Sequence, residues 1–234
     1  MSELKDLGCI LNIDVVQQFL SLKGLSVIDA GCGAMTFSKQ LADKAAQVLA
    51  IDPDAHQAKS NREKDLPANI RFVETGADQL PIEDASVDGV FFSYSLHHVP
   101  SELFADVFSE VTRVIRPGGF LYVIEPIDCP LNTVMRIFHD EESVRAGAQI
   151  ALQTYAVDKF ETCKEVTYHS WRQFESYEDF ALQFCSKTFN SGYTEADVRQ
   201  PKVKETFERL GAPDYKFMAP KRVMCLKGLN AKQN

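Results

Sequence analysis

The sequence predicts an α/β fold, a doubly wound and mainly parallel sheet of seven strands, on the basis of two observations. In the first two-thirds of the chain, short apolar runs alternate with segments of helical periodicity, which is the pattern of parallel strands joined by crossover helices. Near the C-terminus, residues 214–220 and 222–228 form two apolar runs joined by a short turn around Pro220 and Lys221. Because so tight a connection makes a strand pair antiparallel, we expect the last strand to run against the others.

The five strands expected in the first part of the chain are short, apolar on both faces and partly β-branched, as buried parallel strands are. They cover residues 25–29, 48–52, 70–74, 89–93 and 120–125. The clearest helix covers residues 101–115, where apolar residues follow the i, i+3, i+4, i+7 spacing. Ser101 is placed to cap its start, and the RPGG segment at 116–119 ends it. A further helix is expected over residues 198–211, with Gly211 at a typical stop position.

The domain organisation follows from a change in this pattern after Glu125. Residues 1–126 form the expected core, residues 127–192 a mostly helical insertion after the fifth strand, and residues 193–234 a helix and strand pair that complete the core. The insertion holds the single tryptophan and many other aromatic residues, which either wall a substrate pocket or form the insertion's own core. As substrate contacts we select Tyr155, Tyr168, Trp171 and Tyr177.

The composition argues against several classes of protein. The net charge is −8 and no run of lysine and arginine offers the basic face that nucleic acid needs, so we expect no nucleic-acid partner. No segment approaches the ~20 apolar residues of a membrane span, and the N-terminus lacks the basic and apolar blocks of a secretory signal. We therefore expect a cytoplasmic protein. Its six cysteines stand apart, without a CxxC pair or zinc-like spacing, and are expected to be reduced thiols.

A glycine loop follows the first of the five strands, in the stretch VIDAGCGAMT at 27–36. Gly31 allows a tight turn, and Gly33 allows a ligand to approach the backbone closely. A pyrophosphate-binding loop would carry a third glycine at residue 36, where this chain has threonine. Asp29 adds a carboxylate that would repel a pyrophosphate and could accept hydrogen bonds from an ammonium group. The loop therefore favours a ligand with a positive charge.

A second acid, Asp52, ends the next strand about 20 residues after the glycines, where an acid binds ribose hydroxyls. A carboxylate can accept from both hydroxyls at once. The alternative is that Asp52 caps the helix that follows it. The two roles are compatible.

Four motifs occur in one ordered series over residues 25–126: DAGCG at 29–33, AIDPD at 50–54, ETGADQLPIEDASVDGVFFSYSLHHV at 74–99, and EVTRVIRPGGFLYVIEP at 110–126. In this order the chain resembles the class I S-adenosylmethionine-dependent methyltransferases, most closely the UbiE-like group that acts on small molecules. The resemblance implies a Rossmann-like fold with S-adenosylmethionine as cofactor. It places Asp29, Gly31 and Gly33 around the methionine end of the cofactor, Asp52 and Pro53 at the ribose, Ala77 and Asp78 at the adenine, and Ser93 and Tyr94 facing the sulfonium.

Two positions depart from the family pattern. The loop usually carries another glycine where this chain has Met35, a side chain that would crowd the methionine carboxylate. The adenine loop often has an acid where this chain has Gly76. Asp78 either replaces that acid by binding the adenine amino group or is an exposed loop acid.

Methyl transfer is an in-line displacement on a sulfonium, so the protein mainly aligns donor and acceptor and excludes water. A hydroxyl or carbon acceptor needs a base, whereas a thiolate or neutral amine does not. Candidate bases at the ends of the fourth and fifth strands are His97, His98 and Glu125, although the histidines could instead only shape the loop. We expect no metal, because no third ligand stands at a recognisable spacing from the histidine pair.

The sequence thus predicts methyl transfer from S-adenosylmethionine to a small, largely apolar metabolite. Two alternatives stay open. One is a partner protein that binds the cofactor without catalysis, and the other is a nicotinamide-dependent oxidoreductase, against which Asp29 and the missing third glycine argue. The acceptor atom, the pathway and the oligomeric state are not determined by the sequence.

Overall fold

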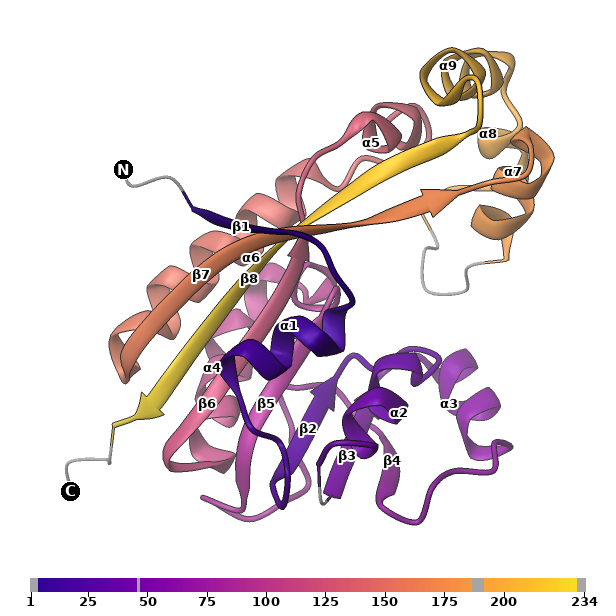
Figure 1. The fold of residues 1–234 in the computed structure, drawn as a ribbon. Coiled ribbons are helices and arrows are strands. Elements are labelled where there is room, and N and C mark those ends of the chain that lie inside the picture. The colour runs from indigo at the N-terminus through magenta and orange to yellow at the C-terminus, as the bar shows by residue number, and fades with distance from the viewer. Residues whose placement is uncertain (1–3, 46, 187–191, 231–234) are drawn as a thin grey trace.

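A computed structural model describes residues 4–45, 47–186 and 192–230. These residues form one mixed sheet of eight strands in the order β1-β7-β8-β6-β5-β2-β3-β4 (Figure 1). The strands are β1 (Lys5–Cys9), β2 (Ser26–Ala30), β3 (Gln47–Asp52), β4 (Ile70–Glu74), β5 (Val87–Ser93), β6 (Ile115–Pro126), β7 (Phe160–Gln173) and β8 (Lys216–Leu229). The five strands expected in the first part of the chain are confirmed as β2 to β6. They pair in parallel, and β8 runs antiparallel to β6.

The C-terminal part differs from the prediction, because β8 is one continuous strand where a pair joined by a turn was expected. Pro220 lies inside it and accepts a hydrogen bond of 3.0 Å from the backbone N–H of Ile127. The ladder between β6 and β8 ends at the Pro126–Lys221 pair. The backbone of Pro220 faces the β6 side of β8, where this ladder has already ended. The N–H that proline lacks would therefore have had no partner in β6, and no hydrogen bond of the sheet is lost.

Residues 127–192, expected to be mostly helical, contain α5 (Pro130–Met135), α6 (Glu142–Tyr155) and α7 (Tyr177–Cys185), but also the 14-residue strand β7. In β7 the buried Val166 and Tyr168 alternate with more exposed residues, so the strand has no continuous apolar run. β7 pairs along its whole length with β8, and β1 adds to its other edge. These pairings make the sheet one strand larger than the sequence predicted.

The remaining helices are α1 (Asn12–Phe19), α2 (Thr36–Ala42), α3 (Ala55–Arg62), α4 (Phe104–Val114), α8 (Glu195–Val198) and α9 (Pro201–Gly211). The two sheet faces are covered by separate apolar clusters, because successive strand residues point to opposite faces. Val90 and Phe92 pack on the side of α4 and α6, whereas Phe91 packs on the side of α1 and α2. The helix expected over residues 101–115 is confirmed as α4 with a 3-10 turn before it.

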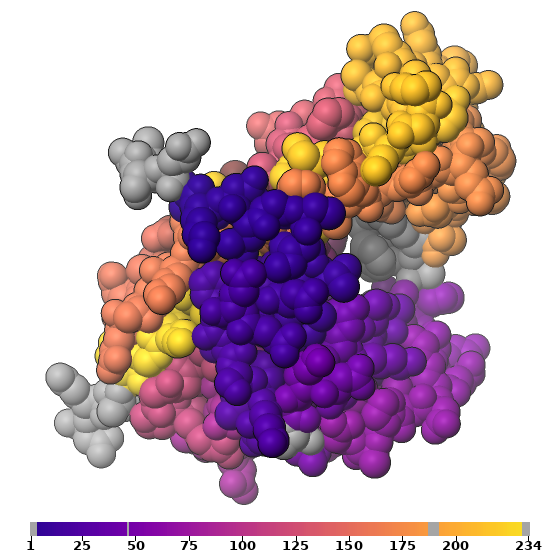
Figure 2. All heavy atoms as spheres, viewed as in Figure 1, coloured from indigo at the N-terminus to yellow at the C-terminus, as the bar shows by residue number. Residues whose placement is uncertain are grey.

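The β7–β8 ribbon extends beyond the rest of the sheet, and α5, α7, α8 and α9 gather at its far end (Figure 1). A third apolar cluster, rich in phenylalanine, joins these helices to the ribbon. The N-terminal segment, drawn in indigo, lies across the viewed face of the molecule (Figure 2). Among the described residues, no helix combines the length and apolar character that crossing a membrane requires.

Candidate active site

A cavity of about 680 Å³ opens at the carboxyl ends of β2, β3, β4 and β5. This is where the strand order reverses, between β5 and β2, and ligands of doubly wound sheets bind at such points. Eight of the nine residues that the family resemblance assigned to the cofactor line this cavity. They are Gly31, Gly33, Asp52, Pro53, Ala77, Asp78, Ser93 and Tyr94.

The two glycines of the first loop serve different purposes. Gly31 has φ 72°, and a Cβ added there would overlap the Cβ of Ser95. Ser95 in turn donates a hydrogen bond of 2.5 Å to the carbonyl of Ala30, which fixes the loops after β2 and β5 to each other. Gly33 has φ 49°, and a Cβ added there would meet no atom within 4 Å. Gly31 is thus required by packing, whereas Gly33 leaves open space in the cavity.

Met35 does not crowd the cavity, contrary to the expectation from the sequence. Its side chain is fully buried in the cluster of α1 and α2. Its backbone has φ 62°, in the left-handed region that glycine adopts most readily. This conformation gives a physical reason for the glycine that the family usually carries at this position.

Asp52 connects the end of β3 to the glycine loop. Its Oδ2 accepts a hydrogen bond of 2.7 Å from the Gly33 N–H, and its Oδ1 accepts one of 2.9 Å from the Asp54 N–H. The helix that follows is capped by Asp54, whose side chain accepts from the N–H groups of His56 and Gln57. Asp52 is therefore not the N-cap, and each of its oxygens keeps a further lone pair for a ligand in the cavity.

Asp29 lies behind the loop and does not line the cavity, so the structure does not place it against a ligand as the resemblance implied. Its Oδ2 accepts a hydrogen bond of 2.5 Å from the Ser38 hydroxyl in α2. Its Oδ1 is buried and has no hydrogen-bond partner among the described residues. Burial raises the pKa of Asp29 to about 6, and the nearby Asp52 carboxylate adds to this, although the Ser38 hydrogen bond acts to lower it.

The loop after β4 explains the glycine at position 76. A Cβ added at Gly76 would overlap the Oδ1 of Asp78. Asp78 and Ala77 both line the cavity. An acid at position 76 would thus displace the carboxylate of Asp78.

A second cavity of about 450 Å³ adjoins the first and shares Asn12, Tyr94 and His98 with it. Its other walls come from the loop after β6, from α5 and α6, and from the β7–β8 ribbon. Asn12 Oδ1 accepts hydrogen bonds from the hydroxyls of Tyr94, at 3.1 Å, and Tyr168, at 2.8 Å. Burial raises the pKa of Tyr94 to about 12, so its hydroxyl stays protonated and can donate this bond. The N-terminal helix is thereby tied to the boundary between the two cavities.

His97 and Glu125 form a buried pair at the side of the second cavity. The Nδ1 of His97 contacts the Glu125 carboxylate, and the His97 backbone N–H donates a bond of 3.3 Å to Glu125 Oε1. His97 and His98 both line this cavity, with ring centroids 4.1 Å apart, whereas Glu125 lines neither cavity. Desolvation and the neighbouring His97 ring lower the pKa of His98 to about 4. His97 and His98 thus face the cavity, and Glu125 orients His97.

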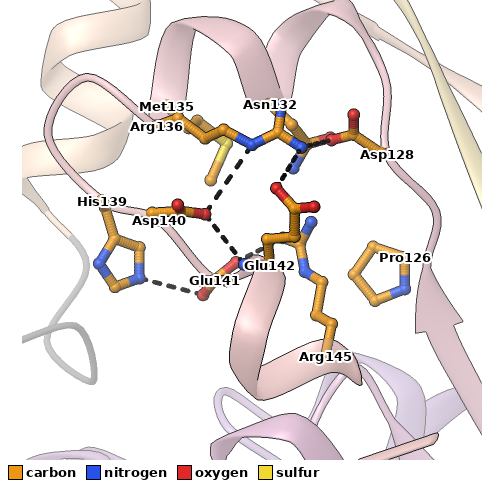
Figure 3. Close-up of a pocket in the computed structure, with 10 residues that line it drawn as sticks. All are labelled: Pro126, Asp128, Asn132, Met135, Arg136, His139, Asp140, Glu141, Glu142 and Arg145. Carbon is orange, nitrogen blue, oxygen red and sulfur yellow. Dashed lines mark hydrogen bonds and ion pairs between the residues drawn. The ribbon is translucent and has the colours of Figure 1, made fainter. Parts of the chain in front are cut away.

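The carboxylate of Glu141, a residue that the sequence did not single out, lies close to His97 and His139. Its Oε1 lies 3.1 Å from His139 Nε2 and 4.0 Å from His97 Nε2, and its other oxygen pairs with Arg145. His139, Glu141 and Arg145 also line a smaller cavity of about 170 Å³ (Figure 3). Burial acts to raise the pKa of Glu141, but Arg145 and the histidines outweigh it and hold that pKa below its usual value.

This arrangement supplies the third candidate metal ligand that the sequence did not reveal. Donor atoms of His97, His98 and Glu141 lie within 4.8 Å of one another. However, Arg145 already neutralises Glu141, and its guanidinium would repel a metal ion at the same carboxylate. The arrangement is therefore accounted for by ion pairing within the protein.

Comparison with known proteins accords with this geometry. Residues 28–123 match the family described as methyltransferase domain. The chain is therefore similar to methyltransferase domains over this part of its length. It is 29% identical over 66% of its length to the ubiquinone/menaquinone biosynthesis C-methyltransferase UbiE of Brucella anthropi, and 32% identical over 44% of its length to the demethylmenaquinone methyltransferase of Lactococcus lactis. The aligned regions span 58% and 43% of these two relatives.

Among solved structures, the YcgJ protein of Bacillus subtilis superposes with a TM-score of 0.62 at 16% identity. The match covers 91% of this chain and 96% of the other, and it shows the fold alone. The family match thus includes both the glycine loop and the strand that ends at Asp52, and the fold similarity covers most of the chain.

Among the described residues that line the first and second cavities, none is one of the four aromatic residues expected to contact a substrate. Tyr155 stacks on Phe108 at the surface, and Trp171 is 47% exposed. Tyr177 donates to the Val198 carbonyl and packs in the third cluster. Tyr168 is buried, and its hydroxyl donates to Asn12 Oδ1. The residues that do face the second cavity from the ribbon are Ser170, Arg172, Ala219, Pro220 and Lys221.

Proposed function

We propose that this protein transfers a methyl group from S-adenosylmethionine to a small molecule. The observation that carries the proposal is the pair of adjoining cavities that share Asn12, Tyr94 and His98. The first cavity is lined by the glycine loop and Asp52, and the second cavity lies beyond the carboxyl ends of β5 and β6. A donor in the first cavity and an acceptor in the second would meet at these shared residues.

The first cavity suits the cofactor in size and in chemistry. Its volume of about 680 Å³ lies within the range of small-molecule sites. Asp52 is already fixed by two backbone N–H groups and would accept hydrogen bonds from the ribose hydroxyls. Asp78 and Ala77 would contact the adenine, and the open space at Gly33 would admit the methionine end.

The bound cofactor supplies a methyl group on a positively charged sulfonium, which is already a good leaving group. The protein has to hold the acceptor in line with it and exclude water. Tyr94 begins the segment after β5 in a left-handed conformation, φ 59°, and its N–H donates to the carbonyl of Ile124. This fixes the segment to β6, and with it the shared wall between donor and acceptor.

His97 is our candidate for a general base. The Glu125 carboxylate holds the proton on His97 Nδ1, which leaves Nε2 as the nitrogen that accepts a proton. A hydroxyl or an acidic carbon in the second cavity would lose its proton to this atom, whereas a thiolate or neutral amine would not need it. Glu125 acts through His97 and is a positioning residue.

The two alternatives are not favoured. The family and the two relatives that match this chain are methyltransferases, and Met35, which had left a non-catalytic role open, is turned away from the cavity. A cytoplasmic location and the absence of a nucleic-acid partner remain predictions from the sequence.

Incubation with S-adenosylmethionine carrying an isotope-labelled methyl group, over a panel of small hydroxyl, thiol, amine and carbon acceptors, tests the proposal. We expect label in an acceptor together with S-adenosylhomocysteine as the second product. Stoichiometric cofactor binding with no transfer over the whole panel would favour the non-catalytic alternative.

A further inference from the structure

Two cationic side chains, Lys221 and Arg172, face the second cavity with no acidic partner among the described residues. Lys221 lies in β8 and Arg172 in β7, and both line the cavity. Neither forms an ion pair with any carboxylate of the residues that the structure describes. Buried charges are usually paired, because removing a charge from water costs several kcal/mol, so the buried Lys221 beside the partly buried Arg172 calls for an anionic ligand.

Lys221 is held in place by neutral groups. It is only 7% exposed, its Nζ donates to the Ser170 hydroxyl, and the same atom lies 5.2 Å from the centroid of the Tyr168 ring. Burial lowers the pKa of Lys221 to about 8, and the charge of Arg172 acts in the same direction. An ammonium has three N–H donors, so two remain for a ligand.

Arg172 is positioned on the same face of the ribbon, two residues after Ser170. Its guanidinium carbon lies 5.4 Å from the Phe174 ring centroid and 5.6 Å from that of Phe184. Within the described part of the chain, its guanidinium donates a hydrogen bond to Gln183 Oε1 that is long at 3.5 Å. The planar fork of a guanidinium matches a carboxylate or a phosphate, and most of its five donors are available here.

The single carboxylate that lines this cavity does not compensate these charges. Among the described lining residues that carboxylate is Glu141, and it already pairs with Arg145 and His139. The cavity therefore keeps an excess of positive charge, although the whole chain carries a net charge of −8.

We propose that the methyl acceptor carries an anionic group, a carboxylate or a phosphate, which Lys221 and Arg172 bind. This inference rests on the proposed function, since it treats the second cavity as the acceptor site. The apolar walls, which include Ile127, Leu131 and Met135, would hold the rest of the molecule. The largely apolar acceptor expected from the sequence thereby gains an anionic head.

Calorimetric titration with benzoate, phenyl phosphate and benzamide, in the presence of saturating S-adenosylhomocysteine, tests this site directly. Benzamide has the shape of benzoate without its charge. The variants are Lys221→Met, Lys221→Arg and Arg172→Met. Lys164→Met is the matched control, because Lys164 is an exposed lysine of strand β7, the strand that also carries Arg172.

We expect benzoate or phenyl phosphate to bind the wild type, and Lys221→Met and Arg172→Met each to weaken this binding roughly tenfold or more, since each removes a charge-assisted hydrogen bond. Lys164→Met should bind like the wild type, and Lys221→Arg should keep most of the affinity. Tighter binding of one anion than of the other assigns the head group. Because Lys221 lacks a counter-ion, Lys221→Met should not lower the thermal unfolding temperature, which separates lost binding from misfolding.

Equal binding of benzamide and benzoate, or unchanged anion affinity in the folded Lys221→Met and Arg172→Met variants, would overturn the inference. So would the absence of anion binding to the wild type with the cofactor product bound. Failure of the proposed function is a different result, namely no binding of S-adenosylhomocysteine or no methyl transfer over the acceptor panel, whatever the anions do.

Discussion

The imidazole of His97 and the carboxylate of Glu125 are joined twice, by Nδ1 of the ring and by the backbone N–H of the same histidine. The contact links the short turn after β5 to the end of β6. It fixes both the position of the ring and the nitrogen that carries the proton, which are the two properties that a general base requires.

Glu125→Gln should therefore lower kcat roughly 100-fold for a hydroxyl or carbon acceptor, because an amide no longer stabilises the charged imidazole or selects its tautomer. The affinity for S-adenosylmethionine should stay unchanged, since Glu125 lines neither cavity. Steady-state kinetics together with cofactor titration measures both quantities, and Glu165→Gln, at a partly exposed ion pair with Arg222, serves as control. An equal loss of cofactor affinity would show that Glu125 only maintains the fold.

Asp52→Ala should weaken binding of S-adenosylhomocysteine by about 2 kcal/mol or more, through loss of charge-assisted hydrogen bonds. Part of the effect arises within the protein, because Asp52 also accepts from the N–H of Gly33. Calorimetry on the folded variant measures the change, and Asp158→Ala, at an exposed acid of a 3-10 turn, is the control. Unchanged affinity would refute the ribose assignment.

Alanine at the two glycines should have opposite consequences. Gly31→Ala should lower the free energy of unfolding strongly, since the new Cβ would overlap Ser95 and force the loops after β2 and β5 apart. Gly33→Ala should cost only about 1–2 kcal/mol for its left-handed backbone, while its methyl group narrows the cavity and weakens cofactor binding. Denaturant unfolding and calorimetry measure the two effects. Normal cofactor affinity in Gly33→Ala would contradict the placement of the methionine end.

The buried carboxylate of Asp29 makes stability depend on pH. Its pKa is raised from 3.8 to about 6 in the folded protein, so the folded state binds more protons than the unfolded state between these values. The contribution of Asp29 to the free energy of unfolding should then fall as pH rises from about 4 to about 6 and stay level above that.

In Asp29→Asn this dependence is removed, so the stability of the variant relative to the wild type should rise by up to about 3 kcal/mol over the same pH range. Urea unfolding of both proteins across this range measures the difference, with Asp158→Asn as an exposed control. A difference in stability between the two proteins that does not change with pH would mean that burial does not raise the pKa of Asp29.

The part of the fold that could be predicted from the sequence is the part with local signals. Strands β2 to β6 are short apolar runs, and α4 has a regular apolar stripe. Strand β7 was not predicted, because it is buried on one face only and has Glu161, Lys164 and Glu165 between its buried residues. Pro220 suggested a turn, and only the register of the strands, in which the β6–β8 ladder ends at Lys221, shows why a proline is tolerated there.

The same division holds for the site. The loops after β2, β3 and β4 carry local motifs, so the sequence could bring Gly33, Asp52 and Asp78 together at one cavity. The second cavity is assembled from α5, α6 and two antiparallel strands, and no local spacing brings Lys221 near Arg172. The aromatic residues that we selected as substrate contacts do not line that cavity. Aromatic side chains also form apolar cores, and in this protein they form the third apolar cluster.

Calorimetric titration of the wild-type protein with S-adenosylmethionine and S-adenosylhomocysteine, with NADH as control, tests the central claim most directly. We predict one site per chain with a micromolar dissociation constant for the first two and no binding of NADH. Binding of NADH without either sulfur compound, or binding of none of the three, would contradict the assignment of the cavity beside Asp52 to S-adenosylmethionine.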